Sequence, residues 1–210
     1  MALCKNKTLS DLNFYGNHLG EEGGKELAEA LNQNTTLISL DLGDNGIWAE
    51  GGNALADALC NNSGLKSLDL ADNFCRESIE TLAESLCENS TLTSLDISGN
   101  IIYKDEGKAL AWALRINKSL TSLVIDICQL DWKDIIKAIA KALHKNVTLT
   151  SLTIHYTYEP YIRIEEDFEY YSSEYAEFDE SERLDTYKEI EDLLKEIRKK
   201  IRKDIEIRLL

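Results

Sequence analysis

A short leucine pattern returns at a nearly constant interval along most of this sequence. Leu37, Leu40 and Leu42 are followed by Asn45, and the same slots are filled again in later copies. The first leucines of successive copies are separated by 28, 28, 27, 28 and 29 residues, at Leu9, Leu37, Leu65, Leu92, Leu120 and Leu149. A fixed interval in this range predicts a solenoid, in which stacked copies of one structural unit share a continuous core.

Each copy joins a strand pattern to a helix pattern. Leu40 and Leu42 alternate with polar residues, which predicts a short strand with one buried face. A second motif, Gly-x-x-Leu-x-x-x-Leu-x-x-Asn, begins at Gly24 and recurs in phase, and its leucines form one apolar stripe on a helix. Asn45 and its equivalents stand where the chain leaves the strand, so we expect their amides to bind backbone groups that this turn leaves unpaired.

The two motifs, in phase from residue 1 to 157, resemble the leucine-rich repeats of the longer, helix-containing ribonuclease-inhibitor class. The resemblance implies an α/β fold, a right-handed horseshoe-shaped solenoid with parallel strands on the concave face and helices on the convex face. It also implies a non-enzymatic protein-protein interaction module, because such solenoids serve mostly as binding surfaces. By similarity to other members of this class, the chain is expected to be a bacterial effector, or an inhibitor that blocks an enzyme from the concave face.

Composition changes after the repeats. Residues 158–181 are rich in tyrosine and acidic side chains, contain the single proline Pro160, and are interpreted as a linker. The alternative is an acidic strip that pairs with a basic partner or whose tyrosines accept phosphate. Apolar residues then recur at helical spacing from Leu184 to Ile205, which predicts an amphipathic helix over residues 182–210. We expect this helix to cap the last repeat. The alternative is a helix that binds a partner or joins two copies of an otherwise monomeric protein.

Charge and cysteine content limit the partners and the compartment. A formal net charge of −15 argues against nucleic acid and anionic membranes as partners. The first residues lack the apolar core of a signal peptide, and five cysteines without a CxxC pair suit a reducing compartment, so a cytoplasmic location, in this cell or a host cell, is expected. Residues 2–6 align with the end of a repeat helix, so further repeats upstream are a hypothesis.

The exposed positions of the strands predict an acidic concave surface. The central position reads Asn13, Asp41, Asp69, Asp96, Val124 and Thr153 in successive copies, without lysine or arginine. Three adjacent carboxylates favour a protein partner with a basic, protruding surface. The alternative is that aspartate is simply the usual residue of the repeat at this position.

The character of this surface changes in the fifth and sixth copies. In these copies we predict a binding hot spot that comprises Val124, Asp126, Ile127, His155 and Tyr156. Tyr15 is expected to contribute to binding at the other end of the same face. The alternative is that the C-terminal segment packs on these residues.

Aromatic residues recur in the turn from strand to helix. Trp48 occupies the slot of Gly20, and Tyr103 and Trp132 stand at or beside it in later copies. Exposed aromatic side chains near one rim are typical binding anchors. The alternative is that each ring folds over its own helix. Trp112 is predicted to point outward from the convex helices.

No arrangement of residues predicts catalysis. The three histidines lack a serine or cysteine partner at a motif spacing, there is no phosphate-binding loop, and single carboxylates in a column do not form a metal cage, so neither cofactor nor metal is expected. The alternative function is a targeting or regulatory leucine-rich-repeat fragment of a larger protein whose catalytic domain lies outside this chain.

Overall fold

The parallel strands of the sheet follow one another in chain order. The computed structural model describes residues 2–73, 75–128, 131–157, 180–200 and 205–210. Its seven-stranded sheet has the order β1-β2-β3-β4-β5-β6-β7, and every neighbouring pair is parallel. The strands are β1 (Asp11–Asn13), β2 (Ser39–Asp41), β3 (Ser67–Asp69), β4 (Ser94–Ile102), β5 (Ser122–Cys128), β6 (Ser151–Thr157) and β7 (Glu206–Leu209).

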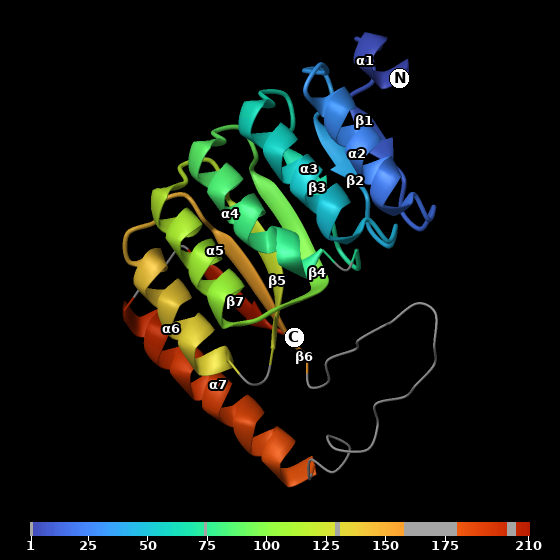
Figure 1. Cartoon of the computed structure of the whole chain (residues 1–210). Helices are drawn as coiled ribbons and strands as arrows, with labels where there is room; N and C mark the ends of the chain where they lie inside the picture. Colours follow the sequence, from blue (N-terminus) through green and yellow to red (C-terminus); the bar gives the residue numbers. More distant parts are fainter. Residues whose placement is uncertain (1, 74, 129–130, 158–179, 201–204) are drawn as a thin grey trace.

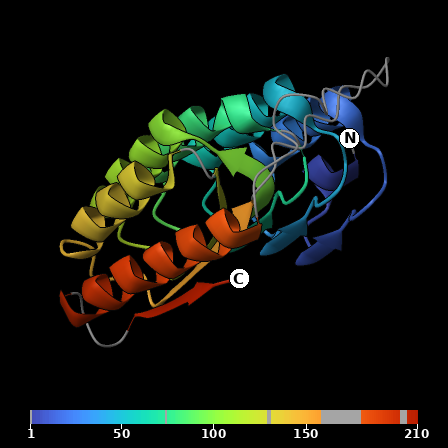
Figure 2. The same cartoon turned by 90° about the horizontal axis from the view of Figure 1, so that it is seen from below.

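Helices cover the opposite side of each repeat. They are α1 (Ala2–Lys5), α2 (Gly20–Leu31), α3 (Trp48–Asn61), α4 (Ile79–Glu88), α5 (Lys104–Ile116), α6 (Trp132–Leu143) and α7 (Glu180–Lys200), with a short 3-10 turn at Arg76–Ser78. Figure 1 shows α2 to α7 side by side in chain order, and Figure 2 shows the row of helices lying apart from the strands. The predicted leucine-rich solenoid is therefore confirmed.

The core lies between the strands and the helices. Leu40, Leu68, Leu95 and Leu123 are partners in successive strand pairs, and each is at most 2% exposed. A fully buried leucine contributes about 1.5–3 kcal/mol through removal of apolar area from water. Since every repeat buries its leucines against the next, the stability of the fold is mainly a sum of interfaces between neighbours.

Two ladders of buried asparagines bind the repeats to one another. The Asn73 amide donates to the Leu42 and Ala71 carbonyls at 2.8 and 2.9 Å, and its oxygen accepts from the Asn45 and Ile47 amides at 3.1 and 3.3 Å. A second ladder follows the helices, with equivalent bonds at Asn34, Asn62, Asn89, Asn117 and Asn146. The predicted role of the strand-end asparagines is confirmed.

The end of the chain differs from the prediction. A helix over residues 182–210 is wrong for the last residues, because α7 ends at Lys200 and β7 joins the sheet beside β6. The physical reason is the alternation of buried Ile205 and Ile207 with exposed Glu206 and Arg208, a strand pattern that overlaps the last turns of the helical one.

The pairing of β6 with β7 also redefines the sixth repeat. Glu206 lies 55 residues after its partner Ser151, whereas the earlier partners of this position are 27 to 29 residues apart. The sixth repeat thus carries an insertion between its strand β6 and its helix α7. Most of the predicted linker, residues 158–179, lies outside the described residues.

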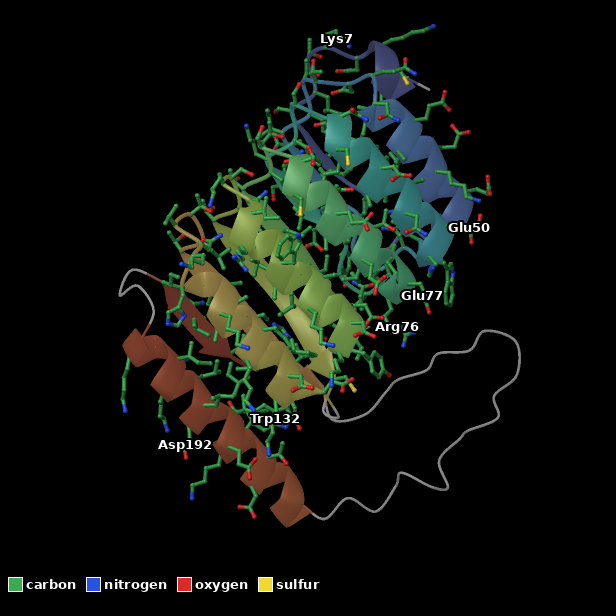
Figure 3. All side chains as sticks on the ribbon, turned by 60° about the vertical axis from the view of Figure 1, so that its left-hand side comes forward. Lys7, Glu50, Arg76, Glu77, Trp132 and Asp192 are labelled. Carbon is green, nitrogen blue, oxygen red and sulfur yellow. The ribbon has the colours of Figure 1, made fainter. Side chains whose placement is uncertain are left out.

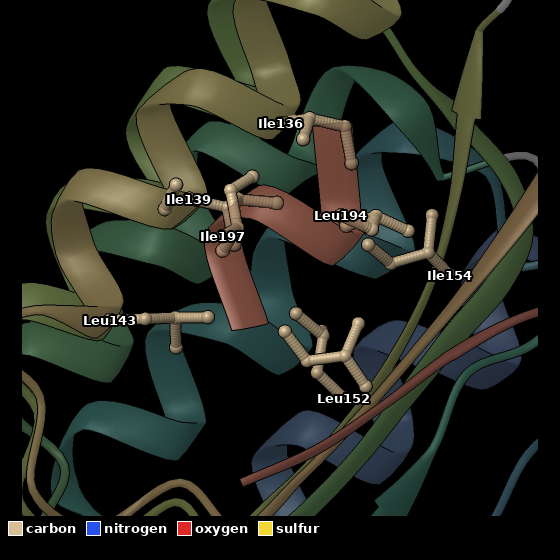
Figure 4. Close-up of a pocket in the computed structure, with 9 residues that line it drawn as sticks. Ile136, Ile139, Leu143, Leu152, Ile154, Leu194 and Ile197 are labelled. Carbon is tan, nitrogen blue, oxygen red and sulfur yellow. The ribbon is translucent and has the colours of Figure 1, made fainter. Parts of the chain in front are cut away.

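Helix α7 closes the apolar core beside α6. Leu194 and Ile197 face Ile136 and Ile139 of α6, and with Leu152 of β6 they line a small apolar cavity (Figure 4). Leu194 is only 2% exposed and Ile197 only 7%. The helix therefore covers the last repeat of the solenoid, as a cap does.

Candidate concave binding surface

The three predicted aspartates lie side by side on the sheet. Asp41 is the strand partner of Asp69, and Asp69 is the partner of Asp96. Each carboxylate accepts a hydrogen bond from the backbone amide two residues further on, at 2.9–3.0 Å. These bonds orient the carboxylates along one column, which begins at Asn13, whose amide donates to Asp41 at 2.7 Å. The same position is filled by Val124 on β5, Thr153 on β6 and Arg208 on β7. We call the whole row, from Asn13 to Arg208, the concave column.

The neighbouring carboxylates raise the proton affinity of Asp69, the central one of the three. The pKa of Asp69 lies above its ordinary value mainly because of burial; the Ala71 amide lowers this pKa, and Asp96 and Asp41 raise it. Neighbouring strands lie about 4.8 Å apart. Two unit negative charges at this distance repel each other by about 1–3 kcal/mol at a surface-like dielectric constant, before screening by salt. None of the ion pairs formed among the described residues involves Asp41, Asp69 or Asp96.

A second group of acids lies beyond the strand ends. The pKa of Asp72 is raised by desolvation and by Asp126 and Asp44, while His155 lowers it. Asp72 crowds Gly99, where an added Cβ would lie 2.0 Å from the Asp72 carboxylate and where φ is +71°. Gly99 is thus required for the close approach of the two strand ends.

Asp126 and His155 lie side by side on β5 and β6. Asp126 is 8% exposed, accepts from the Gly99 amide at 2.8 Å, and lies 3.6 Å from His155 Nδ1. His155 is Asp126's strand partner, so both side chains stand in the position next to the concave column. The Tyr156 side chain is half-buried and packs against the core.

Two predicted site residues are not on the surface. Ile127 is 0% exposed and belongs to the core, so its placement in a hot spot is wrong. A register shift pairs Ile127 with Ile102, and β5 continues its alternation so that Leu123, Ile125 and Ile127 all face inward. Trp132 is 6% exposed, so its prediction as an exposed binding anchor is wrong.

The remaining aromatics occupy two separate places. Tyr15 is 57% exposed and its ring lies against Gly43 on the concave side. Trp48 and Tyr103 stand at helix starts on the rim, and both are half-buried. Tyr103 carries the Arg76 guanidinium 4.8 Å from its ring centre, and Figure 3 shows Arg76 and Glu77 close together at this rim.

Arg208 and Glu206 were missed by sequence reasoning. Arg208 is the strand partner of Thr153, so the concave column runs from Asn13 to a cation on β7, and Arg208 Nε lies 2.9 Å from Glu206. The alternation of the last residues was the available signal, but it was assigned to a helix. The column is therefore acidic in β2 to β4 and uncharged in β5 and β6, before Arg208.

No group of three or more histidine, cysteine or acidic side chains among the described residues is placed to hold a metal ion. Within the same residues, no helix combines the length and the apolar character that a membrane span needs. The five cysteines form no disulfide bond with one another, and burial raises the pKa of Cys75 to about 12.

Comparison with known proteins agrees with this fold. A family model described as Leucine Rich repeat matches residues 5–28, 33–56 and 88–107. Three segments of the chain thus match this model, and the fold is that of a leucine-rich-repeat solenoid. The chain is also similar to the solved structure of the leiomodin-1 actin-binding site 2, at 18% identity over 94% of this chain and 88% of that one, with a TM-score of 0.44. Another is the tropomodulin C-terminal domain of Caenorhabditis elegans, at 13% identity over 93% of this chain and 91% of that one, with a TM-score of 0.48. No curated protein matches the sequence.

Proposed function

We propose that this chain is a protein-binding module that takes a basic, protruding segment of its partner onto the concave column. The observation that supports this proposal is the in-register row of Asp41, Asp69 and Asp96, whose mutual repulsion a lysine or arginine of the partner would relieve. Small neighbours such as Gly43, Ala71 and Ser98 leave room above the carboxylates for such a side chain.

The finer roles follow from what carries the basic segment. If it borders an enzyme's active site, the module is an inhibitor; if it belongs to a host protein, the module is an effector. A targeting fragment of a larger protein would use the same surface. Cysteines that form no disulfide bond with one another favour a reducing compartment such as the cytosol for all three roles.

The test is an affinity capture with matched variants. The concave variant carries Asp41→Asn, Asp69→Asn and Asp96→Asn, and the control carries Glu26→Gln, Glu29→Gln and Asp57→Asn, which remove the same charge from exposed convex positions. Ile127 is left unchanged because it lies in the core.

We expect wild type and control to retain the same basic protein, and the folded concave variant to lose it. Capture of the same proteins by all three forms would contradict binding at the concave column. Thermal unfolding of each form establishes that the substitutions leave the fold intact.

A further inference from the structure

The convex face carries an exposed apolar stripe on its middle helix. Trp112 is 57% exposed and Ile116 38%, and the two stand one turn apart on the outer side of α5. The Arg115 guanidinium lies 5.5 Å from the centre of the Trp112 ring, yet more than half of the residue's surface remains in water. The predicted outward direction of Trp112 is thus confirmed.

Two stripes of opposite charge flank it. Helix α5 lies between α4 and α6 (Figure 1). Glu84 on α4 occupies the position of Trp112 one repeat earlier, and Lys141 on α6 occupies it one repeat later. The same order of acidic, apolar and basic side chains is found one helical turn further on, where Ile116 stands between Glu88 and Lys145. The full acidic stripe on α4 is Glu80, Glu84 and Glu88, and the full basic stripe, which runs along α6 and just past it, is Lys137, Lys141 and Lys145.

The six charged side chains of the two stripes are exposed, and within the described residues none of them forms an ion pair. Neighbouring helices pack about 8–10 Å apart, so the acidic and basic stripes, two helices apart, lie about 20 Å from each other. They cannot neutralise one another in a single molecule.

We propose that this face binds a second copy of the chain, with Trp112 and Ile116 at a two-fold axis that runs parallel to α5. Such an axis exchanges the two sides of α5, so Glu84 of one copy meets Lys141 of the other and each Trp112 meets its equivalent. An axis across the helices would instead set Glu84 against Glu84. The order of acidic, apolar and basic side chains therefore selects one geometry for the dimer. A dimer of this kind differs from the monomer that the sequence predicts.

The size of the face predicts a weak dimer. Helices of 10 to 13 residues are about 15–20 Å long, and three of them span about 30 Å, which gives about 450–600 Å² per copy. Specific interfaces commonly bury about 800 Å² per partner. The net charge of −15 adds repulsion between copies that is screened at about 0.15 M salt, so the dimer is expected at high protein concentration and physiological salt.

The experiment is sedimentation velocity on the full chain, up to hundreds of micromolar by order of magnitude, the range for weak complexes. One variant carries Glu84→Lys and Glu88→Lys, and a second carries Lys141→Glu and Lys145→Glu. Each is expected to weaken self-association about tenfold or more, because four attractive contacts become repulsive. The control, Glu26→Lys with Glu29→Lys on α2, makes the same charge change away from the stripes.

Mixing provides the decisive outcome. In a one-to-one mixture of the two variants, both sets of contacts pair opposite charges again, so a heterodimer is expected where neither variant dimerises alone. A monomeric wild type, a dimer that survives in either single variant, or a mixture that stays monomeric would each overturn the proposal. Thermal midpoints close to that of wild type establish that the exposed substitutions leave the fold unchanged.

Discussion

The concave and convex faces carry their charges in opposite ways. On the concave side, Asp41, Asp69 and Asp96 are adjacent and share one sign. On the convex side, the stripes that contain Glu84 and Lys141 have opposite signs and are held apart by α5. The positions recur with the period of the solenoid, whereas the residue at each position decides the charge: the convex position reads Glu84, Trp112 and Lys141 in successive repeats.

The difference teaches what each face can bind. A surface of one sign repels its own copy and attracts a molecule of the other sign, which suits a different protein. A surface with separated signs is complementary to itself after a two-fold rotation. The repeat therefore supplies one scaffold with two unlike surfaces, and the following predictions separate the scaffold from each surface.

The largest effect is expected from loss of the scaffold. Asn73→Ala removes four hydrogen bonds and leaves buried backbone groups unpaired, which should lower the free energy of unfolding by about 3–5 kcal/mol. The exposed Asn17 makes only local side-chain bonds, to Phe14 and Tyr15, so Asn17→Ala should cost less than about 1 kcal/mol. Urea unfolding measures both, and equal losses would contradict the ladder's role.

The concave variant separates binding from stability. Replacing Asp41, Asp69 and Asp96 by asparagine keeps an oxygen for the backbone amides and removes the mutual repulsion, so stability should rise by about 1 kcal/mol after screening while partner capture is lost. The control at Glu26, Glu29 and Asp57 should change stability by less than about 0.5 kcal/mol. A destabilised concave variant would show that the carboxylates serve the fold.

The pH dependence tests the desolvation and the charge repulsion of two aspartates without a partner. The folded-state pKa values of Asp69 and Asp72 are raised above the ordinary 3.8. As pH rises above 4, the unfolded chain releases these protons first, so stability falls with rising pH until the folded carboxylates are also ionised. Relative to an Asp69→Asn, Asp72→Asn variant, wild type should gain stability as pH is lowered from 7 towards 4. Parallel stability curves would contradict the raised pKa values.

A smaller effect is expected at the rim between the two faces. Trp48 has a φ of +55°, in the left-handed region, and Gly20 fills the same slot in the preceding repeat with a φ of +67°. Left-handed backbone costs a non-glycine residue about 1–2 kcal/mol. Trp48→Gly should therefore be about 1 kcal/mol more stable than Trp48→Ala, the reverse of their order inside a helix. Thermal unfolding of the two variants decides the matter.

The sequence predicted the repeated part of the fold because each leucine slot is filled again in every copy. The register of Asp41, Asp69 and Asp96 followed from the interval alone. Prediction failed where the interval changes: the insertion after β6 hid the strand that carries Arg208, and the longer β5 turned Ile127 inward. Periodicity places repeated residues, whereas the ends and bulges depend on contacts that have no second copy in the sequence.

The most direct measurement of the central claim is a titration of the isotopically labelled chain with a lysine-rich peptide, followed by backbone amide shifts. Two acidic rows compete in one molecule: Asp41, Asp69 and Asp96 on the concave side, and Glu80, Glu84 and Glu88 on the convex side. We predict saturable shifts concentrated at the concave row and at Gly43, Ala71 and Ser98, which are the amides bound to it. Shifts concentrated at α4, or spread evenly over both rows, would contradict the assignment of the concave column as the binding surface.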